Sequence, residues 1–265
     1  MSKIGFIGVG NMGYAMLKGV VSHFNLEDIV ITSHSKEKYE RIAKEVNVSC
    51  VDSNAELAKT AKYVILAVKP VIYNAVIEEI KDYVSSETVI ISIAPGISID
   101  SLKKSFGNKV KVVRAMPNTP AMVGEGMTGV SLGKDEFSKE ELEVIDKFFN
   151  SFGKVSYVEE RLMDAIVCGS GSSPAYVYMF IEALADSIVK YGIKRDDAIK
   201  IVAQTVLGSA KMVLETNTHP AILKDNVCSP GGTTIYGVTA LEEYGLRNAI
   251  IKATDACYDK CTKIK

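Results

Sequence analysis

Residues 3–21, KIGFIGVGNMGYAMLKGVV, join a strand-like apolar run to a helical stretch through a glycine-rich turn. In this turn the first glycine permits the sharp bend, the second lets backbone approach a pyrophosphate, and the third lets the helix pack against the strand. The helix, expected from Tyr14 to about Ser22, directs its N-terminal amides at the phosphates. Because the turn follows a strand and opens a helix, it predicts a dinucleotide site, with a purely structural turn as the alternative. The predicted contacts are Gly8, Gly10, Asn11, Met12 and Gly13.

The rest of the first half continues the alternation of apolar runs and helical stretches. Continuous runs of Ile and Val are typical of strands that are buried on both faces. The pattern predicts an α/β fold with a Rossmann-type, doubly wound and mostly parallel sheet. Capping boxes are predicted at Ser53–Glu56 and Ser138–Glu141. The strand candidates are Lys3–Gly8, Asp28–Thr32, Tyr63–Val68, Thr88–Ile93, Lys109–Ala115, Thr128–Leu132 and Lys154–Val158.

The second half has a different pattern, in which the strand signal disappears after Arg161. Long amphipathic stretches, separated by glycine and proline breakers, predict an all-α domain. We therefore expect a dinucleotide-binding domain at residues 1–158 and an all-helical domain at residues 159–265. The longest predicted helices are Ser173–Tyr191, Arg195–Asn217 and Leu246–Lys263.

The strand after the glycine-rich helix decides the predicted cofactor. An NAD site usually has an acid about 20 residues beyond the glycines, whereas the chain here reads Thr32-Ser33-His34-Ser35-Lys36. Hydroxyls and a lysine suit a 2′-phosphate, so Ser33, Ser35 and Lys36 favour NADPH, with NADH possible. In the alternative, a serine caps the next helix and Lys36 is solvated.

Further turns follow strands on the same edge of the sheet, where ligands of open α/β sheets bind. They are Ala67-Val68-Lys69-Pro70 and the turn that begins at Ala94, both predicted to border the cofactor. Asn118, between two prolines, is a further candidate on the nicotinamide side, and the alternative is that it only forms a turn. In the alternative, proline and glycine in the turns after Ala67 and Ala94 serve to end a strand and begin the next helix.

Composition excludes several classes of function. The formal net charge is -1, from 31 basic and 32 acidic residues, so neither nucleic acid nor an anionic membrane is an expected partner. Met1-Ser2-Lys3 leads directly into an apolar run, and the apolar helices carry charges, so neither a signal peptide nor a membrane span is predicted. Five scattered cysteines argue against a disulfide framework and for the cytoplasm. Cys257 and Cys261 have no histidine close in sequence, so no metal is expected.

Residues 220–242 read PAILKDNVCSPGGTTIYGVTALE and resemble the signature segment of pyrroline-5-carboxylate reductases. The centre of that signature is Ser-Pro-Gly-Gly-x-Thr. The resemblance covers the whole chain, because Ala67–Pro70, Arg114–Pro120 and Leu207–Met212 also match in family order. In one departure, Ser173 stands where the family usually has glycine before Pro174-Ala175-Tyr176. We interpret Ser173 as a cap of the following helix.

The resemblance implies hydride transfer from NAD(P)H to the imine of 1-pyrroline-5-carboxylate, which gives L-proline. It assigns Thr234 as the hydroxyl near the ring nitrogen; the alternative is that Thr234 is the N-cap of a helix that starts at Ile235. The substrate carboxylate is expected in a nest of backbone amides. Arg114 is as well explained by a structural or cofactor-facing role as by a carboxylate clamp. The family also implies that the helical domain at residues 159–265 binds the substrate and forms an interlocked homodimer or larger homo-oligomer. The predicted nest residues are Ser229, Gly231, Gly232 and Thr233.

Three rival functions remain open at this point. β-Hydroxyacid dehydrogenases also combine a Rossmann-type half with a helical half. They resemble one another in using a lysine as acid/base on the helix after a glycine-rich turn. In this chain no lysine precedes Lys190 on that helix. A non-catalytic regulatory paralogue predicts the loss of the glycines or of Thr234, and both are intact. A reductase of a related cyclic imino acid differs by one methylene, which is worth only about 1–3 kcal/mol in a pocket.

Overall fold

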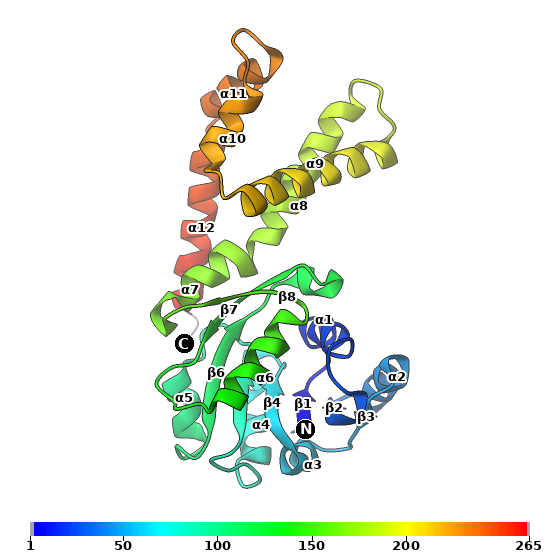
Figure 1. Cartoon of the computed structure of the whole chain (residues 1–265), viewed down its shortest axis with the longest axis vertical. Helices are drawn as coiled ribbons and strands as arrows, with labels where there is room; N and C mark the ends of the chain where they lie inside the picture. The colour runs from blue at the N-terminus through cyan, green and yellow to red at the C-terminus, as the bar shows by residue number, and fades with distance from the viewer. Residues whose placement is uncertain (1–2, 264–265) are drawn as a thin grey trace. The chain divides into compact units, whose positions relative to one another are not determined.

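The computed structural model describes residues 3–263 and divides into two compact units (Figure 1). Residues 3–172 together with 257–263 form the first unit, and residues 173–256 form the second. The last strand ends at Tyr157, and every later element is helical. The predicted functional boundary between residues 158 and 159 stays a prediction.

The first unit is built on one eight-stranded sheet of order β3-β2-β1-β4-β5-β6-β7-β8. All neighbours are parallel except β6 and β7, so the predicted doubly wound, mostly parallel sheet is confirmed. Each predicted strand is present, with ends shifted by one or two residues. The strands are β1 (Lys3–Ile7), β2 (Ile29–Thr32), β3 (Ser49–Cys50), β4 (Ala61–Leu66), β5 (Val89–Ser92), β6 (Lys111–Met116), β7 (Gly126–Ser131) and β8 (Gly153–Tyr157).

Helices cover both faces of this sheet, which is why its central strands are continuously apolar. One face carries α1 (Asn11–Val20), α2 (Lys36–Val46) and α6 (Lys139–Asn150). The other carries α3 (Asn54–Thr60), α4 (Tyr73–Ile80) and α5 (Ile99–Ser105). Short turns η1 (Leu26–Asp28), η2 (Pro70–Ile72), η3 (Thr119–Val123) and η4 (Glu160–Leu162) and the helix α7 (Met163–Ile166) complete the unit with the π-helical turn η5 (Val167–Gly171).

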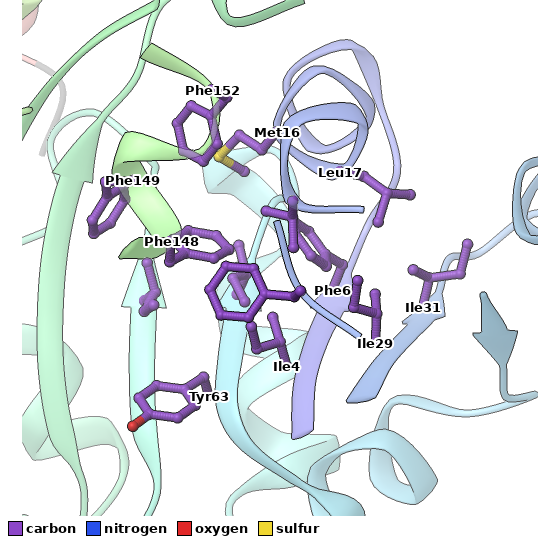
Figure 2. Packing of buried hydrophobic residues seen from close by; sticks show 14 of the residues in the cluster. Ile4, Phe6, Met16, Leu17, Ile29, Ile31, Tyr63, Phe148, Phe149 and Phe152 are labelled. Carbon is purple, nitrogen blue, oxygen red and sulfur yellow. The ribbon is translucent and has the colours of Figure 1, made fainter. Parts of the chain in front are cut away.

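Aromatic side chains fill the first of these faces (Figure 2). The Phe148 ring lies 5.0 Å from that of Phe149 and 5.6 Å from that of Phe152, both edge to face. Phe6 of β1 packs against the same ring at 5.9 Å. The Phe6–Phe148 contact packs α6 against β1, the strand that leads into the glycine-rich turn.

Helix α6 begins with the predicted capping box. Ser138 Oγ accepts a hydrogen bond from the Glu141 amide at 3.2 Å, and Glu141 Oε2 accepts one from the Ser138 amide at 2.8 Å. The box predicted at Ser53 is half confirmed: Ser53 Oγ accepts from the Glu56 amide at 3.1 Å, and this is the one cap bond there within residues 3–263. Both helices therefore begin where the sequence predicts.

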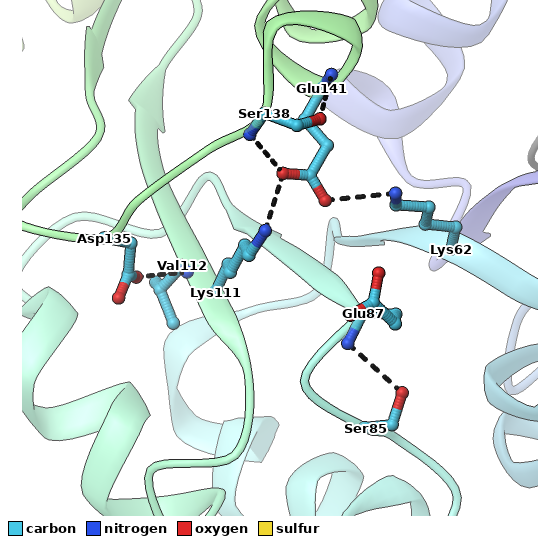
Figure 3. Close-up of polar contacts among 8 residues, drawn as sticks. All are labelled: Lys62, Ser85, Glu87, Lys111, Val112, Asp135, Ser138 and Glu141. Atoms are coloured by element: carbon cyan, nitrogen blue, oxygen red, sulfur yellow. Dashed lines mark hydrogen bonds and ion pairs between the residues drawn. The ribbon is translucent and has the colours of Figure 1, made fainter.

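Glu141 is also the centre of a buried charge cluster (Figure 3). Its side chain is 2% exposed, and its carboxylate contacts Lys62 Nζ at 3.0 Å and Lys111 Nζ at 2.6 Å. Burial alone would raise the pKa of Glu141, but the hydrogen bonds from Lys111, the Ser138 amide and Lys62 outweigh it and lower the pKa to about 2. The carboxylate joins α6 to β4 and β6 through their lysines.

Glu141→Gln is expected to lower the free energy of unfolding by about 3–5 kcal/mol at pH 7, because it leaves two lysines facing a neutral group in a buried site. The folded-state pKa lies below the ordinary value, so the contribution is complete above about pH 4.5 and falls as pH drops towards 2. The difference between wild type and variant should therefore shrink in acid. Urea unfolding at several pH values measures it, with the exposed neighbour Glu140→Gln as control. Equal stabilities of the two variants would contradict this role of Glu141.

The second unit consists of α8 (Ser173–Val189), α9 (Arg195–Thr216), α10 (Pro220–Val227), α11 (Thr233–Glu243) and most of α12 (Leu246–Thr262). The three long helices end within two residues of their predicted ends. Of residues 173–256, the buried hydrophobics are Ala185, Ala198 and Val202. Large apolar side chains such as Met179, Leu207 and Leu214 are 68%, 56% and 77% exposed. An apolar surface of this kind marks an interaction site.

Within the described residues, no helix combines the length and the apolar character that crossing a bilayer requires.

Candidate active site

The glycine-rich turn takes the conformation that its three glycines predict. Gly8 has φ +97°, and a Cβ there would lie 2.7 Å from the Ala67 carbonyl oxygen. A Cβ on Gly13 would lie 2.3 Å from the Gly8 carbonyl oxygen. Gly10 is different, because no atom of residues 3–263 lies within 4 Å of the Cβ position. The turn is tightly packed at its ends and open at its middle glycine, which suits the approach of a pyrophosphate.

Helix α1 begins at Asn11, three residues before the predicted Tyr14, with Gly10 as its N-cap. Asn11 and Met12 therefore belong to the first helical turn, whose amides have no acceptor within the helix. The open space beside the Cα of Gly10, the free amides of the first helical turn and the helix dipole all favour an anion at this point. The residues present thus fit a dinucleotide phosphate.

Two alanine substitutions separate packing from binding in this turn. Gly13→Ala is expected to lower the free energy of unfolding by about 1–3 kcal/mol, because the new methyl collides with backbone. Gly10→Ala should leave unfolding nearly unchanged and weaken dinucleotide binding by about tenfold or more, since its methyl projects into the space for phosphate. Thermal unfolding and titration calorimetry measure the two effects. Wild-type affinity in Gly10→Ala would show that the phosphates do not lie against this glycine.

The neighbouring turns lie along the same edge of the sheet. The Ala67 amide donates to the Ile7 carbonyl at 2.9 Å, which places Ala67 and Val68 beside the glycine-rich turn. Lys69 is the N-cap of η2, and Pro70 is its first residue. Tyr73 Oη donates to the Leu66 carbonyl at 2.7 Å and lies 3.1 Å from Ser92 Oγ. This hydroxyl ties together the carboxyl ends of β4 and β5, after which buried Ala94 follows.

Asn118 is more than a turn former. Its Oδ1 accepts from the Met127 amide at 2.9 Å, and its Nδ2 lies 3.3 Å from both the carbonyl oxygen and the Oγ of Ser170. The side chain is buried and holds the π-helical turn η5 at the end of β6. The sequence indicated the position of Asn118 but not this connection, which depends on residues 52 positions away. Its contact with nicotinamide stays a prediction.

The residues predicted to bind a 2′-phosphate follow β2. Ser35 occupies the N-cap position of α2, but its side chain makes no cap hydrogen bond, and Ser33 is half-buried. Lys36 is exposed and pairs with Asp52, Nζ to Oδ1 at 2.9 Å. The sequence pattern did not indicate Asp52. This residue follows the two-residue strand β3, and β3 has no apolar run that would predict a strand.

The signature segment forms α10, a turn and the start of α11. Gly231 has φ +68°, and the Gly232 amide donates to the Ser229 carbonyl at 3.0 Å. Gly232 is the N-cap of α11, so Thr233 and Thr234 are its first two residues. The alternative that Thr234 caps a helix starting at Ile235 is therefore wrong.

Thr234 lies in the first turn of α11 and is half-buried, while Ser229 and Thr233 are exposed. Among residues 3–263 its hydroxyl has no hydrogen-bond partner, unlike Thr239 on the same helix, whose Oγ1 donates to the Tyr236 carbonyl at 3.0 Å. The first amides of the helix also lack intrahelical acceptors. The segment therefore presents a free hydroxyl next to a set of amide donors.

Two further sequence interpretations are decided by the structure. Arg114 is buried and paired with Glu160 at 3.4 Å and Asp164 at 3.1 Å, so its structural role is confirmed. Ser173 is the first residue of α8, and helical turns lead almost directly into it. Helix α8 therefore begins one residue earlier than a cap at Ser173 would place it.

All five cysteines are free thiols, and Cys168, Cys257 and Cys261 are at least half-buried. No group of metal-binding side chains occurs among the described residues.

Two family models match the chain. Residues 3–96 match the model described as NADP oxidoreductase, coenzyme F420-dependent, and residues 160–264 match the model of pyrroline-5-carboxylate reductase dimerisation. The first covers the glycine-rich turn and the second covers the signature segment. Each model thus falls on one of the two candidate parts of the site.

Known proteins are similar over the full length. The pyrroline-5-carboxylate reductase of Escherichia coli K12 is 43% identical over 264 residues, covering 99% of this chain and 98% of its own. The crystal structure of Plasmodium falciparum pyrroline carboxylate reductase with NADP bound superposes with TM-score 0.89 at 35% identity, covering 99% and 98% of the two chains. A reductase structure from Coxiella burnetii gives TM-score 0.91 at 34% identity, with 100% and 98% covered.

Proposed function

The chain belongs to the pyrroline-5-carboxylate reductase family, and we propose that it reduces 1-pyrroline-5-carboxylate to L-proline with NADPH, with Thr234 at the reacting nitrogen. The observation that carries the assignment of Thr234 is its unbound hydroxyl in the first turn of α11. Of the three hydroxyls of Ser229, Thr233 and Thr234, that of Thr234 is the one that is half-buried, and it has no hydrogen-bond partner within residues 3–263. NADH is the second cofactor to test.

The cofactor would be held by the first unit. The open face of Gly10 and the amides of Asn11, Met12 and Gly13 bind the pyrophosphate. Ser33, Ser35 and Lys36 favour a 2′-phosphate on the ribose, and the turns at Ala67–Pro70, Ala94 and Asn118 border the rest of the cofactor. When bound, NADPH supplies the hydride, and these residues orient it and exclude water.

The substrate carboxylate would lie in the turn before α11. The turn of Ser229, Gly231 and Gly232, with the amide and hydroxyl of Thr233, presents hydrogen-bond donors at a helix N-terminus, where an anion is favoured. No arginine is required, which agrees with Arg114 being paired elsewhere.

Thr234 acts on the imine nitrogen. The carbon of the C=N bond gains the hydride, the C=N double bond becomes a single bond, and the nitrogen takes up a proton to become a secondary amine. The Thr234 hydroxyl orients the nitrogen by a hydrogen bond and passes a proton to it or holds the water that does. An iminium carbon is already electrophilic, so positioning carries most of the catalysis.

A homodimer completes the proposal. The apolar surfaces of α8 and α9 need a partner, and the matching family model is one of dimerisation. A second copy of the chain is that partner, and the signature segment of one chain completes a site with the neighbouring chain. The enzyme would act in the cytoplasm, without nucleic acid or membrane as partner.

The rival functions are less well supported. Helix α8 contains no lysine, so the acid/base residue of a β-hydroxyacid dehydrogenase is missing. A non-catalytic paralogue would not need the intact glycine-rich turn or Thr234. A cyclic imino acid with a six-membered ring remains the alternative substrate, because one methylene changes binding by only about 1–3 kcal/mol.

The deciding assay follows the absorbance of NADPH with pyrroline-5-carboxylate and with a six-membered ring imino acid. We expect oxidation that depends on the imine and is faster with the five-membered ring. NADH is run in parallel. If the folded protein binds NADPH and turns over neither imine, the proposed reaction is wrong.

A further inference from the structure

The Lys36 site contains a carboxylate that the predicted 2′-phosphate site did not include. Asp52 Oδ1 lies 2.9 Å from Lys36 Nζ and accepts a hydrogen bond from Tyr39 Oη at 2.7 Å. Tyr39 is 3% exposed and fixes the carboxylate from the core side. Lys36 also lies 3.8 Å from Glu40. Two acidic side chains therefore surround the one lysine that would meet a phosphate.

The position of Asp52 follows from the sheet. Strand β3 is the outer neighbour of β2 and parallel to it, with Ile31 paired to Cys50. The carboxyl ends of β2 and β3 therefore lie at one edge, which in doubly wound sheets is the edge that binds the ligand. Lys36 follows the first of these ends in the chain, and Asp52 follows the second. The acid absent after β2 is supplied by the neighbouring strand.

The two side chains favour different cofactors. Asp52 uses Oδ1 for both of its contacts, and within residues 3–263 its Oδ2 has no hydrogen-bond partner. The hydrogen bonds from Lys36 and Tyr39 lower the pKa of Asp52, so the group is ionised at neutral pH. An ionised carboxylate accepts hydrogen bonds and repels a phosphate, which carries about -1.5 to -2 charges. The Lys36 ammonium group, in contrast, attracts a phosphate.

We propose that Asp52 is a second determinant of cofactor choice, favouring the ribose 2′-hydroxyl of NADH and opposing the 2′-phosphate of NADPH that Lys36 favours. This inference rests on the proposed function, since it concerns the cofactor of that reaction. It goes beyond it by naming a side chain that would weaken a preference for NADPH. The Lys36–Asp52 pair is more than half exposed, at 63% and 70%, so either partner can turn to a ligand.

Asp52→Asn is the sharpest test. The amide oxygen can still accept from Tyr39, so the local fold is kept while the charge is removed. We expect the Kd of NADP⁺ to fall about three- to tenfold and that of NAD⁺ to rise or stay equal, because one charge–charge repulsion near the protein surface is lost. Lys36→Met should shift the ratio of the two constants in the opposite direction by about tenfold.

Titration calorimetry without substrate measures both constants, so this result is independent of turnover. The control is Asp82→Asn, an exposed aspartate elsewhere in the first unit. A ratio within about twofold of wild type in Asp52→Asn, or weaker binding of NADP⁺, would overturn the proposal. If the ratio of the NADP⁺ and NAD⁺ dissociation constants shifts as expected but the protein does not reduce the imine, only the proposed reaction is contradicted.

Discussion

Thr234→Ala is expected to lower kcat for imine reduction by about 100-fold or more, with little change in the Kd of NADPH. Proton transfer or hydrogen bonding to the reacting atom contributes about 10²- to 10⁴-fold in rate. The loss should fall on kcat, because the bond to nitrogen strengthens as the nitrogen gains electron density. Steady-state kinetics and calorimetry together separate the two quantities.

Two variants control this experiment. Thr234→Ser keeps a hydroxyl at the second position of α11 and should recover most of the activity. Thr239→Ala removes a hydroxyl that donates to the Tyr236 carbonyl on the exposed side of the same helix, and should behave as wild type. If Thr234→Ala and Thr239→Ala have equal kcat, Thr234 does not act at the reacting centre.

The sequence predicts the architecture of the first unit well because its signals are local. Short apolar runs, several of them continuous in Ile and Val, identify the seven longer strands, and the capping boxes mark where two helices begin. The strand β3 was missed because it has two residues and both are exposed. Asp52 was missed with it, since its nearness to Lys36 depends on the pairing of β3 with β2.

The candidate site shows the same limit. The glycine-rich turn could be predicted residue by residue, because the requirement for each glycine is local backbone geometry. The alternative role of Thr234 as a cap failed because two glycines and two threonines stand together at the helix start, and local pattern alone does not say which begins the helix. The connection from Asn118 to Ser170 joins distant segments, and no local pattern reports it.

The second unit explains why sequence alone could not decide the oligomeric state. The sequence pattern of an apolar helix is the same whether the helix faces the core of its own chain or a second chain. In the structure, the large apolar residues of α9 such as Ile201, Leu207 and Leu214 are exposed. Exposed apolar surface of this kind marks an interaction site, and the proposed second chain would cover it.

Leu207→Asp is therefore expected to dissociate the dimer and to abolish activity with it. In a two-fold dimer the substitution is present twice, and each unpaired carboxylate buried at the interface costs several kcal/mol. We expect the dissociation constant to rise by about 10³-fold or more. Analytical ultracentrifugation across a range of concentrations measures it, beside the imine assay. Leu207→Met keeps an apolar side chain and should stay dimeric and active.

Leu142→Asp places the same charge on an exposed apolar residue of α6 in the first unit, and should change neither association nor activity. If Leu207→Asp and Leu142→Asp are both dimeric, α9 does not form the interface. If it becomes monomeric and remains fully active, the site is complete within one chain. Loss of activity in step with dissociation would support a site to which both chains contribute.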